Sequence, residues 1–216
     1  MDSFEDISRE YWDDDRSVQS VTSFERCRAY FDETMRGFRL RIGLGTTDVN
    51  LAHRSLTIGS SQIDFIRLCC DKGFRVDQPD EFDYYYLKLV LEGRCEIVTG
   101  DDVVVVKENE AAAVNPFGSL SVSWQGVCEQ VLIRLDRNAL EQTLAEELDI
   151  EVVDPIRFAP VAVPNEESRA TSALVNLLRC DADEAGVFRT WRFYRHFERL
   201  FIWQRCNAFR TTIQSS

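Results

Sequence analysis

The sequence predicts a mainly β fold, an antiparallel β-sandwich or barrel, with a helical layer after it. Apolar residues recur with a period of two between Phe38 and Leu135. Turn residues interrupt this region at short intervals, so it divides into many short strands rather than β-α-β units. From Asp136 onward the apolar residues change to helical spacing.

The expected strands lie between glycine- and proline-containing turns, with Gly73, Gly93 and Gly126 among the separators. They are Phe38–Leu44, Leu51–Ile58, Gln62–Cys70, Tyr84–Leu91, Arg94–Thr99, Val103–Lys107, Ala111–Asn115, Leu120–Trp124 and Val127–Leu135.

Helices are expected on both sides of the strand region. Thr22 and Glu25 have capping-box spacing, which predicts a helix from Ser23 to Arg36. Asp136 is expected to cap a second helix, and two more follow it. These three helices span Arg137–Leu148, Asn165–Arg179 and Glu184–Phe209.

The composition limits the classes of partner. The chain has 216 residues and a formal net charge of −12, which repels nucleic-acid phosphates unless positive charge is segregated. No apolar run is long enough to span a membrane. The first residues are acidic and contain no apolar core of a signal peptide, so we expect a cytoplasmic location.

The supply of reactive side chains argues against a cofactor or metal. Only two histidines occur, His53 and His196, so an inward cluster of three ligands is not available. The seven cysteines are scattered without a C-x-x-C pair, as expected of reduced, buried thiols. No glycine-rich phosphate cradle and no G-x-S-x-G elbow is present. We therefore expect a protein that is not an enzyme and holds no cofactor.

The stretch from Asp83 to Leu144 carries a recognisable set of motifs. Its pieces are Leu91-Glu92-Gly93, Lys107–Ala113, Asn115-Pro116, and Cys128–Leu135 running into Arg137 and Leu140. This stretch resembles the cupin-like N-terminal domain of AraC-type transcription regulators, in the subgroup related to the XylS regulators. Lys107–Glu110 stands where that family often has a Pro-Gly-Asp turn.

The resemblance implies a cupin-like jelly-roll β-barrel that binds a small effector, followed by a C-terminal layer of antiparallel helices that pairs two subunits. We accordingly expect an acidic mobile arm at residues 1–20, a helix and effector-binding barrel at 21–135, and a helical dimerisation region at 136–216. The helix-turn-helix units through which the family contacts DNA are expected to be absent from this chain. A truncated sensor half and a natural short form that acts by heterodimerisation both remain open.

Three residues are candidates for binding the effector. Tyr85 shares its strand face with Leu87 and Leu89, the more apolar face, so an inward hydroxyl is predicted there, while Lys88 marks the other face. Arg67 interrupts an apolar strand and could neutralise an anionic effector. Trp124 could line a pocket. Each could instead be a packing or surface residue.

The last predicted helix is apolar over most of its girth, which requires two packing partners. Trp191, Tyr194, Phe197 and Phe201 are the candidate residues of a homodimer interface. A basic stripe on the same helix could be solvated, could bind the acidic arm, or could contact nucleic acid. It consists of Arg192, Arg195 and Arg199.

Two other classes of protein remain as alternatives. A metal-free cupin-type enzyme could use a carboxylate pair such as Glu96 and Glu129, although alternation in their strands favours outward side chains. A structural dimer would have a barrel filled by its own side chains.

Overall fold

The computed structural model describes residues 19–34, 39–42, 49–58, 61–78, 82–148 and 155–164. Within them the chain forms a ten-stranded sheet in which every described strand pairing is antiparallel. The strands are β1 (Gln19–Val21), β2 (Arg39–Ile42), β3 (Val49–Ile58), β4 (Ser61–Gln78), β5 (Tyr84–Glu92), β6 (Arg94–Thr99), β7 (Asp102–Lys107), β8 (Glu110–Val114), β9 (Leu120–Asp136) and β10 (Val163–Pro164). The helices are α2 (Phe24–Thr34) and α3 (Arg137–Leu148).

Several predicted elements have the bounds expected from the sequence. Strand β6 and helix α3 match them residue for residue. Asp136 caps α3, because its Oδ1 accepts a hydrogen bond of 2.9 Å from the Ala139 amide. At α2 the cap is Ser23 and not Thr22, since the Arg26 amide donates to Ser23 Oγ at 3.4 Å. The two predicted helices beyond residue 164, and with them most of the C-terminal helical layer, lie outside the described residues, as does the arm before Gln19.

The prediction of turns at Gly73 and Gly126 was wrong. Strand β4 continues past Cys70 to Gln78, and β9 runs without a break from Leu120 to Asp136. The two strands pair from Gln62↔Arg134 to Gln78↔Leu120, with a register shift between Cys70 and Phe74. Both glycines have positive φ, +95° and +76°. Gly73 lies within the register shift, where β4 has the extra residues of a β-bulge, and Gly126 pairs with Cys70 at its edge.

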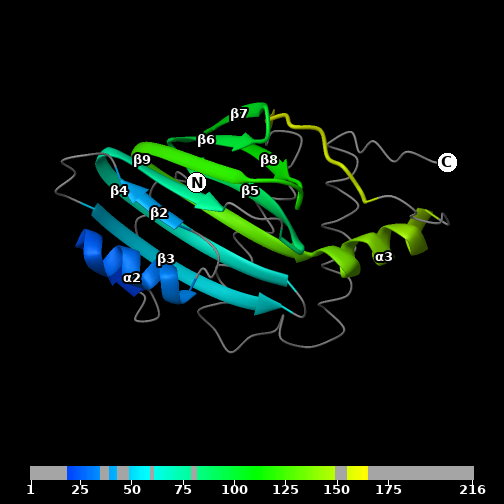
Figure 1. Ribbon diagram of the computed structural model, residues 1–216, viewed down its shortest axis with the longest axis horizontal. Coiled ribbons are helices and arrows are strands. Elements are labelled where there is room, and N and C mark those ends of the chain that lie inside the picture. Colours follow the sequence, from blue (N-terminus) through cyan, green and yellow to red (C-terminus); the bar gives the residue numbers. More distant parts are fainter. Residues whose placement is uncertain are drawn as a thin grey trace, which may run out of the picture.

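The long strand β9 joins two parts of the sheet. Its second half pairs with β5 and its first half pairs with β6, while β4 runs along both halves. Figure 1 shows these strands curving around a common interior, with α2 beside β2 and β3 and α3 leading away from the end of β9. Neither described helix is long and apolar enough to cross a membrane.

Apolar side chains form two cores, one on each face of the central strands. The inner core lies in the interior of the curved sheet and includes Cys27 and Phe31 of α2. The outer core lies on the opposite face and includes Leu140 and Leu144 of α3, together with Ile156 and Phe158. Strand β5 is therefore buried on both faces along almost its whole length.

Gly93, in the turn between β5 and β6, is predicted to tolerate no side chain. Its φ is +78°, and a Cβ atom would lie 2.1 Å from the Val127 carbonyl oxygen. Gly100 is a matched control, because it has φ +57° but nothing within 4 Å of the added carbon. We expect Gly100→Ala to lower the free energy of unfolding by about 1 kcal/mol, the cost of the left-handed conformation alone. Gly93→Ala should lower the free energy of unfolding, measured by urea denaturation, by about 3 kcal/mol or more, because the backbone clash is added. Equal losses in the two variants would contradict the backbone clash.

Candidate ligand-binding site

A small cavity lies within the inner core. Its volume is about 30 Å³. Its walls come from helix α2, from strands β4, β5 and β9, and from one residue of β8. They are Phe31, Ile66, Leu68, Phe74, Val76, Tyr86, Lys88, Val114, Leu120, Val122, Trp124, Gln130 and Leu132. Most of these side chains are apolar, as in small-molecule sites generally.

Lys88 is the one lysine or arginine among these lining residues. The residue is only 3% exposed, and its Nζ atom lies 4.7 Å from the centroid of the Trp124 ring. Burial lowers the pKa of this amine, because the charged form is poorly solvated there. Within the described part of the chain, no salt bridge joins Lys88 to a carboxylate. The cation–π contact with Trp124 compensates only part of the lost hydration.

The thiols that act electrostatically on Lys88 do not neutralise it. They belong to Cys95 and Cys128, both almost fully buried. Burial raises the pKa of both thiols, that of Cys128 to about 12. Both are therefore uncharged near neutral pH, and they supply no counter-ion to the ammonium group.

Trp124 lies between the cavity and a larger open cleft. Its indole Nε1 donates a hydrogen bond of 3.3 Å to Gln130 Oε1. Its ring packs against Phe74 at 5.6 Å, and Phe74 packs against Phe31 of α2 at 5.7 Å. Trp124 and Phe74 line both the cavity and the cleft, whose volume is about 520 Å³.

The cleft has a positively charged rim. Arg41 and Arg75 share one carboxylate, Asp77, with N···O distances of 2.8 Å and 2.7 Å. Arg94 also lines the cleft and makes no salt bridge within the described residues. With Glu96 as the one acidic lining residue, the rim favours the approach of an anion.

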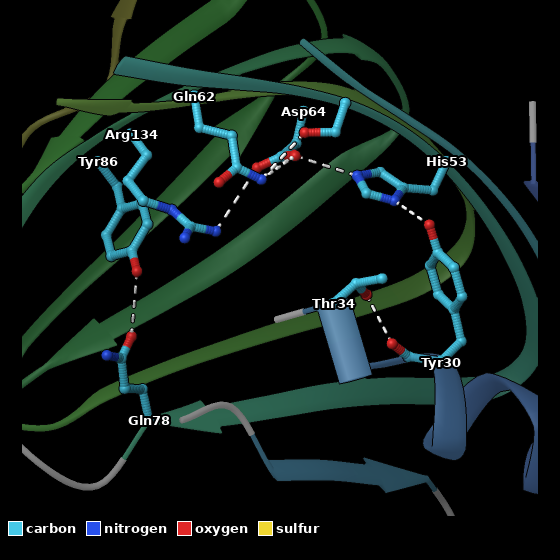
Figure 2. A network of polar contacts seen from close by, with 9 residues as sticks. Tyr30, Thr34, His53, Gln62, Asp64, Gln78, Tyr86 and Arg134 are labelled. Carbon is cyan, nitrogen blue, oxygen red and sulfur yellow. Dashed lines mark hydrogen bonds and ion pairs between the residues drawn. The ribbon is translucent and has the colours of Figure 1, made fainter. Parts of the chain in front are cut away.

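A chain of buried polar contacts occupies another part of the interior (Figure 2). His53 Nδ1 is hydrogen-bonded to the hydroxyl of Tyr30 in α2, and His53 Nε2 lies 3.1 Å from Asp64 Oδ1. Gln62 Nε2 donates to the same Asp64 oxygen at 2.8 Å. Because the Asp64 carboxylate can only accept, Nε2 carries a proton, and in a neutral ring Nδ1 accepts from the Tyr30 hydroxyl.

The Asp64 side chain is held as a carboxylate. Burial by itself would raise its pKa, but the hydrogen bonds and charge of His53, with hydrogen bonds from Ser55 and Gln62, lower the pKa below its usual range. Arg134 Nη2 lies 3.7 Å from Asp64 Oδ2, too far for a hydrogen bond.

Tyr30, His53 and Asp64 are hydrogen-bonded in series, as in a catalytic relay. The pKa of the Tyr30 hydroxyl is, however, shifted in the wrong direction for catalysis. Burial, followed by the charge of Asp64, raises the pKa of the Tyr30 hydroxyl. An activated nucleophile or base needs the opposite shift. These hydrogen bonds instead hold α2 against β3 and β4. Among the described residues, no group of three or more His, Cys, Asp or Glu side chains is placed to hold a metal ion.

The three predicted effector-binding residues lie in different places. Trp124 lines the cavity. Tyr85 is in the outer core, where its hydroxyl lies 2.8 Å from both Glu141 Oε1 and the Ile156 carbonyl oxygen. Arg67 is partly exposed, with Nη2 4.0 Å from Glu92 Oε2. Neither Tyr85 nor Arg67 lines the cavity, and their ligand roles stay predictions.

The inner face of β5 was not anticipated from the sequence. Lys88 was expected on the face opposite the inward Tyr85, but it is buried in the inner core region together with Tyr86. A lysine within an otherwise apolar strand was the available signal. The predicted interface residues Trp191, Tyr194, Phe197 and Phe201 lie outside the described residues.

Comparisons with known proteins give a consistent result. The model of the AraC-binding-like domain family matches residues 27–202. The crystal structure of the AraC-like transcriptional activator CuxR aligns with 93% of this chain and 72% of that chain, with a TM-score of 0.62 and 11% identity. This likeness and the family match confirm the prediction of a mainly β, cupin-like jelly-roll fold.

More limited likenesses were found to two other cupin structures. A cupin superfamily protein from Desulfitobacterium hafniense DCB-2 is 19% identical and has a TM-score of 0.35, covering 40% of this chain and 77% of that chain. The Cnp3 cupin domain of Schizosaccharomyces pombe is 10% identical and has a TM-score of 0.34, covering 50% of this chain and 77% of that chain. No curated protein matches the sequence.

The buried carboxylate of Asp64 should contribute to stability in a pH-dependent way. Asp64→Asn is expected to lower the free energy of unfolding at pH 7 by about 3 kcal/mol, because His53 and Arg134 lose a buried anionic partner. Since the folded state lowers the pKa of Asp64, its contribution is present above the ordinary pKa of about 4 and is lost as the pH falls through the folded value. The difference between variant and wild type should therefore shrink on acidification in urea denaturation series. Asp77→Asn is the control, because this partly buried carboxylate pairs with two exposed arginines, and it should lose no more than about 1 kcal/mol at pH 7. A pH-independent deficit for Asp64→Asn would contradict the assignment.

The hydroxyl of Tyr85 should stabilise the docking of α3 and the segment around Ile156. Tyr85→Phe removes the two 2.8 Å contacts and keeps the ring, so we expect a loss of about 1–2 kcal/mol in the free energy of unfolding. Tyr84→Phe, on the neighbouring half-buried residue, should change stability by less than about 0.5 kcal/mol. Thermal and urea unfolding of the two variants test this prediction. If Tyr85→Phe and Tyr84→Phe are equally stable, the Tyr85 hydroxyl has no structural role.

Proposed function

The chain belongs to the AraC-binding-like domain family, and from this we propose that it is the effector-binding and dimerisation domain of a cytoplasmic AraC-type transcription regulator. The observation that carries the proposal is the cavity in the inner core, which has mostly apolar walls and one buried lysine, Lys88. The effector is a small molecule that binds at this cavity, with Trp124 as a contact. The role is regulatory rather than catalytic.

The contact with DNA is assigned to helix-turn-helix units of the regulator and not to this cupin-like domain. The formal net charge of −12 supports this assignment, because nucleic-acid binding depends on neutralising phosphates. The domain would act on DNA binding indirectly, through the arrangement of two subunits.

The position of α2 suggests how a bound effector changes the domain. Phe31 of α2 lines the cavity, and its neighbour Tyr30 is hydrogen-bonded to His53. An effector in the cavity therefore contacts the helix directly. If it binds one arrangement of α2 more tightly than another, it shifts the population toward that arrangement by its difference in affinity.

The subunit interface is assigned to the last predicted helix. An amphipathic helix buries one apolar stripe, whereas this segment has apolar residues over most of its circumference. One side would pack on the barrel and the other on a symmetry-related copy, in an isologous contact. Trp191, Tyr194, Phe197 and Phe201 are the proposed interface residues.

Sedimentation equilibrium tests the dimer. The wild-type chain should sediment as a dimer, and the double variant Phe197→Asp/Phe201→Asp should sediment as a folded monomer, because two carboxylates cannot be buried unpaired in the interface. Thr211→Asp adds a charge after the predicted helix and should leave the dimer intact. Circular dichroism checks that each variant is folded. A wild-type chain that remains monomeric at every concentration would remove the dimerisation half of the proposal.

A further inference from the structure

We propose that the effector of this domain is a small organic carboxylate with an apolar body, whose carboxylate group pairs with the ammonium group of Lys88. The inference rests on the proposed function, in which the inner-core cavity is the effector site. It assigns the chemical class of the ligand, which the family membership leaves open.

Lys88 is buried without an anionic partner among the described residues. A buried ammonium group loses its hydration and needs an anion or several acceptors to compensate. Within the described residues Lys88 makes no salt bridge, and its polar contact is the Trp124 ring at 4.7 Å. Asp64, the buried inward carboxylate, is engaged by His53 and Gln62. A carboxylate supplied by a ligand would complete the pairing.

The remaining walls of the cavity are mostly apolar. Besides Lys88, the polar lining groups are Gln130 and Tyr86, and both already have partners in the protein. Gln130 Oε1 accepts from Trp124, and the Tyr86 hydroxyl donates to Gln78 Oε1 at 3.5 Å. A sugar needs many polar partners, because each buried hydroxyl without one is destabilising. The walls instead match a ligand with one anionic group and an apolar remainder.

The size of the cavity and its position beside the cleft determine how a ligand can enter. A cavity of about 30 Å³ holds about one or two water molecules, so an organic acid requires it to open. Trp124 and Phe74 line both the cavity and the cleft of about 520 Å³. A displacement of the Trp124 side chain would join the two spaces, and their sum lies in the range of about 300–1,000 Å³ typical of ligand sites.

The charge of the cleft supports the same class of ligand. An anion that approaches the opening meets Arg41, Arg75 and Arg94 before it reaches Lys88. These side chains raise the local concentration of anions against the overall negative charge of the protein. The path therefore leads from a cationic rim, past two aromatic rings, to a buried cation.

Isothermal titration calorimetry with matched probes tests the inference on the whole chain. Benzoate and hexanoate are compared with benzamide and hexanamide, which have nearly the same shape and no charge, and with glucose. The wild-type protein should bind at least one carboxylate about tenfold or more tightly than its amide, because a charge-assisted contact is lost in the amide.

Substitutions then locate the charge that is recognised. Lys88→Met keeps the length of the side chain and should weaken carboxylate binding about tenfold or more, with little effect on the amides. Lys88→Arg should retain the preference for the carboxylate. Without ligand, Lys88→Met should melt no lower than the wild type, since it removes a buried charge; this separates lost recognition from lost folding. Lys107→Gln, an exposed charge that lines neither space, should change the equilibrium affinity by less than about threefold. Arg94→Gln, at the rim of the cleft, should weaken carboxylate binding less than Lys88→Met does, because its charge is exposed to solvent.

Three results would overturn the inference: equal affinities for acids and amides, unchanged carboxylate binding by Lys88→Met, or no binding of either carboxylate. A dominant effect of Arg94→Gln would also overturn it by placing the site in the open cleft. Binding of an amide or of glucose, unaffected by Lys88→Met, would leave the proposed sensor function standing. Absence of binding by every probe, together with a monomeric wild type in sedimentation, would count against both proposals.

Discussion

The antiparallel pairing of β9 with β4 is the contact on which the rest of the structure depends. The pairing extends over both strands, but each strand bends where Gly73 and Gly126 take up positive φ. The bend leaves one half of β9 to pair with β5 and the other half with β6, so a single strand belongs to two parts of the sheet. Trp124, two residues before Gly126, is thereby placed between the cavity and the open cleft. A straight β9 could not pair with both β5 and β6, and one side of the inner core would then be open.

The period-two pattern of the sequence predicted the position of most strands but not which face of them is the interior. On β5 the more apolar face, with Tyr85, Leu87 and Leu89, was predicted to point inward, and it lies in the outer core with residues of α3. The inner face carries Tyr86 and Lys88. Alternation separates the two faces of a strand, but when both faces are buried it cannot distinguish between them. The glycines were misread for a related reason, since a positive φ serves a turn and a β-bulge equally well.

The buried polar chain was beyond prediction because strand register creates it. His53 lies opposite Ile66 in the β3–β4 pair, so Asp64 is its diagonal neighbour two residues along. A shift of one residue would move Asp64 to the other face and leave His53 without its acceptor. Nothing local in the sequence fixes that register, and the third member, Tyr30, comes from a helix 23 residues earlier. The sequence could only note that His53 was one of two histidines.

Helix α2 is held to the sheet by an apolar and a polar contact, and only the apolar one reaches the cavity. Phe31 packs on Phe74, which packs on Trp124, the side chain that must move to open the cavity. Tyr30, one residue earlier, is tied to His53 and through it to Asp64, and none of these three residues lines the cavity. A ligand that displaced Trp124 would therefore act on the apolar contact of α2 and not directly on the polar one. The helix follows β1 in the chain, and β1 pairs with β3, the strand that carries His53. The apolar and the polar contact of α2 thus connect the cavity and the buried polar residues to the same helix.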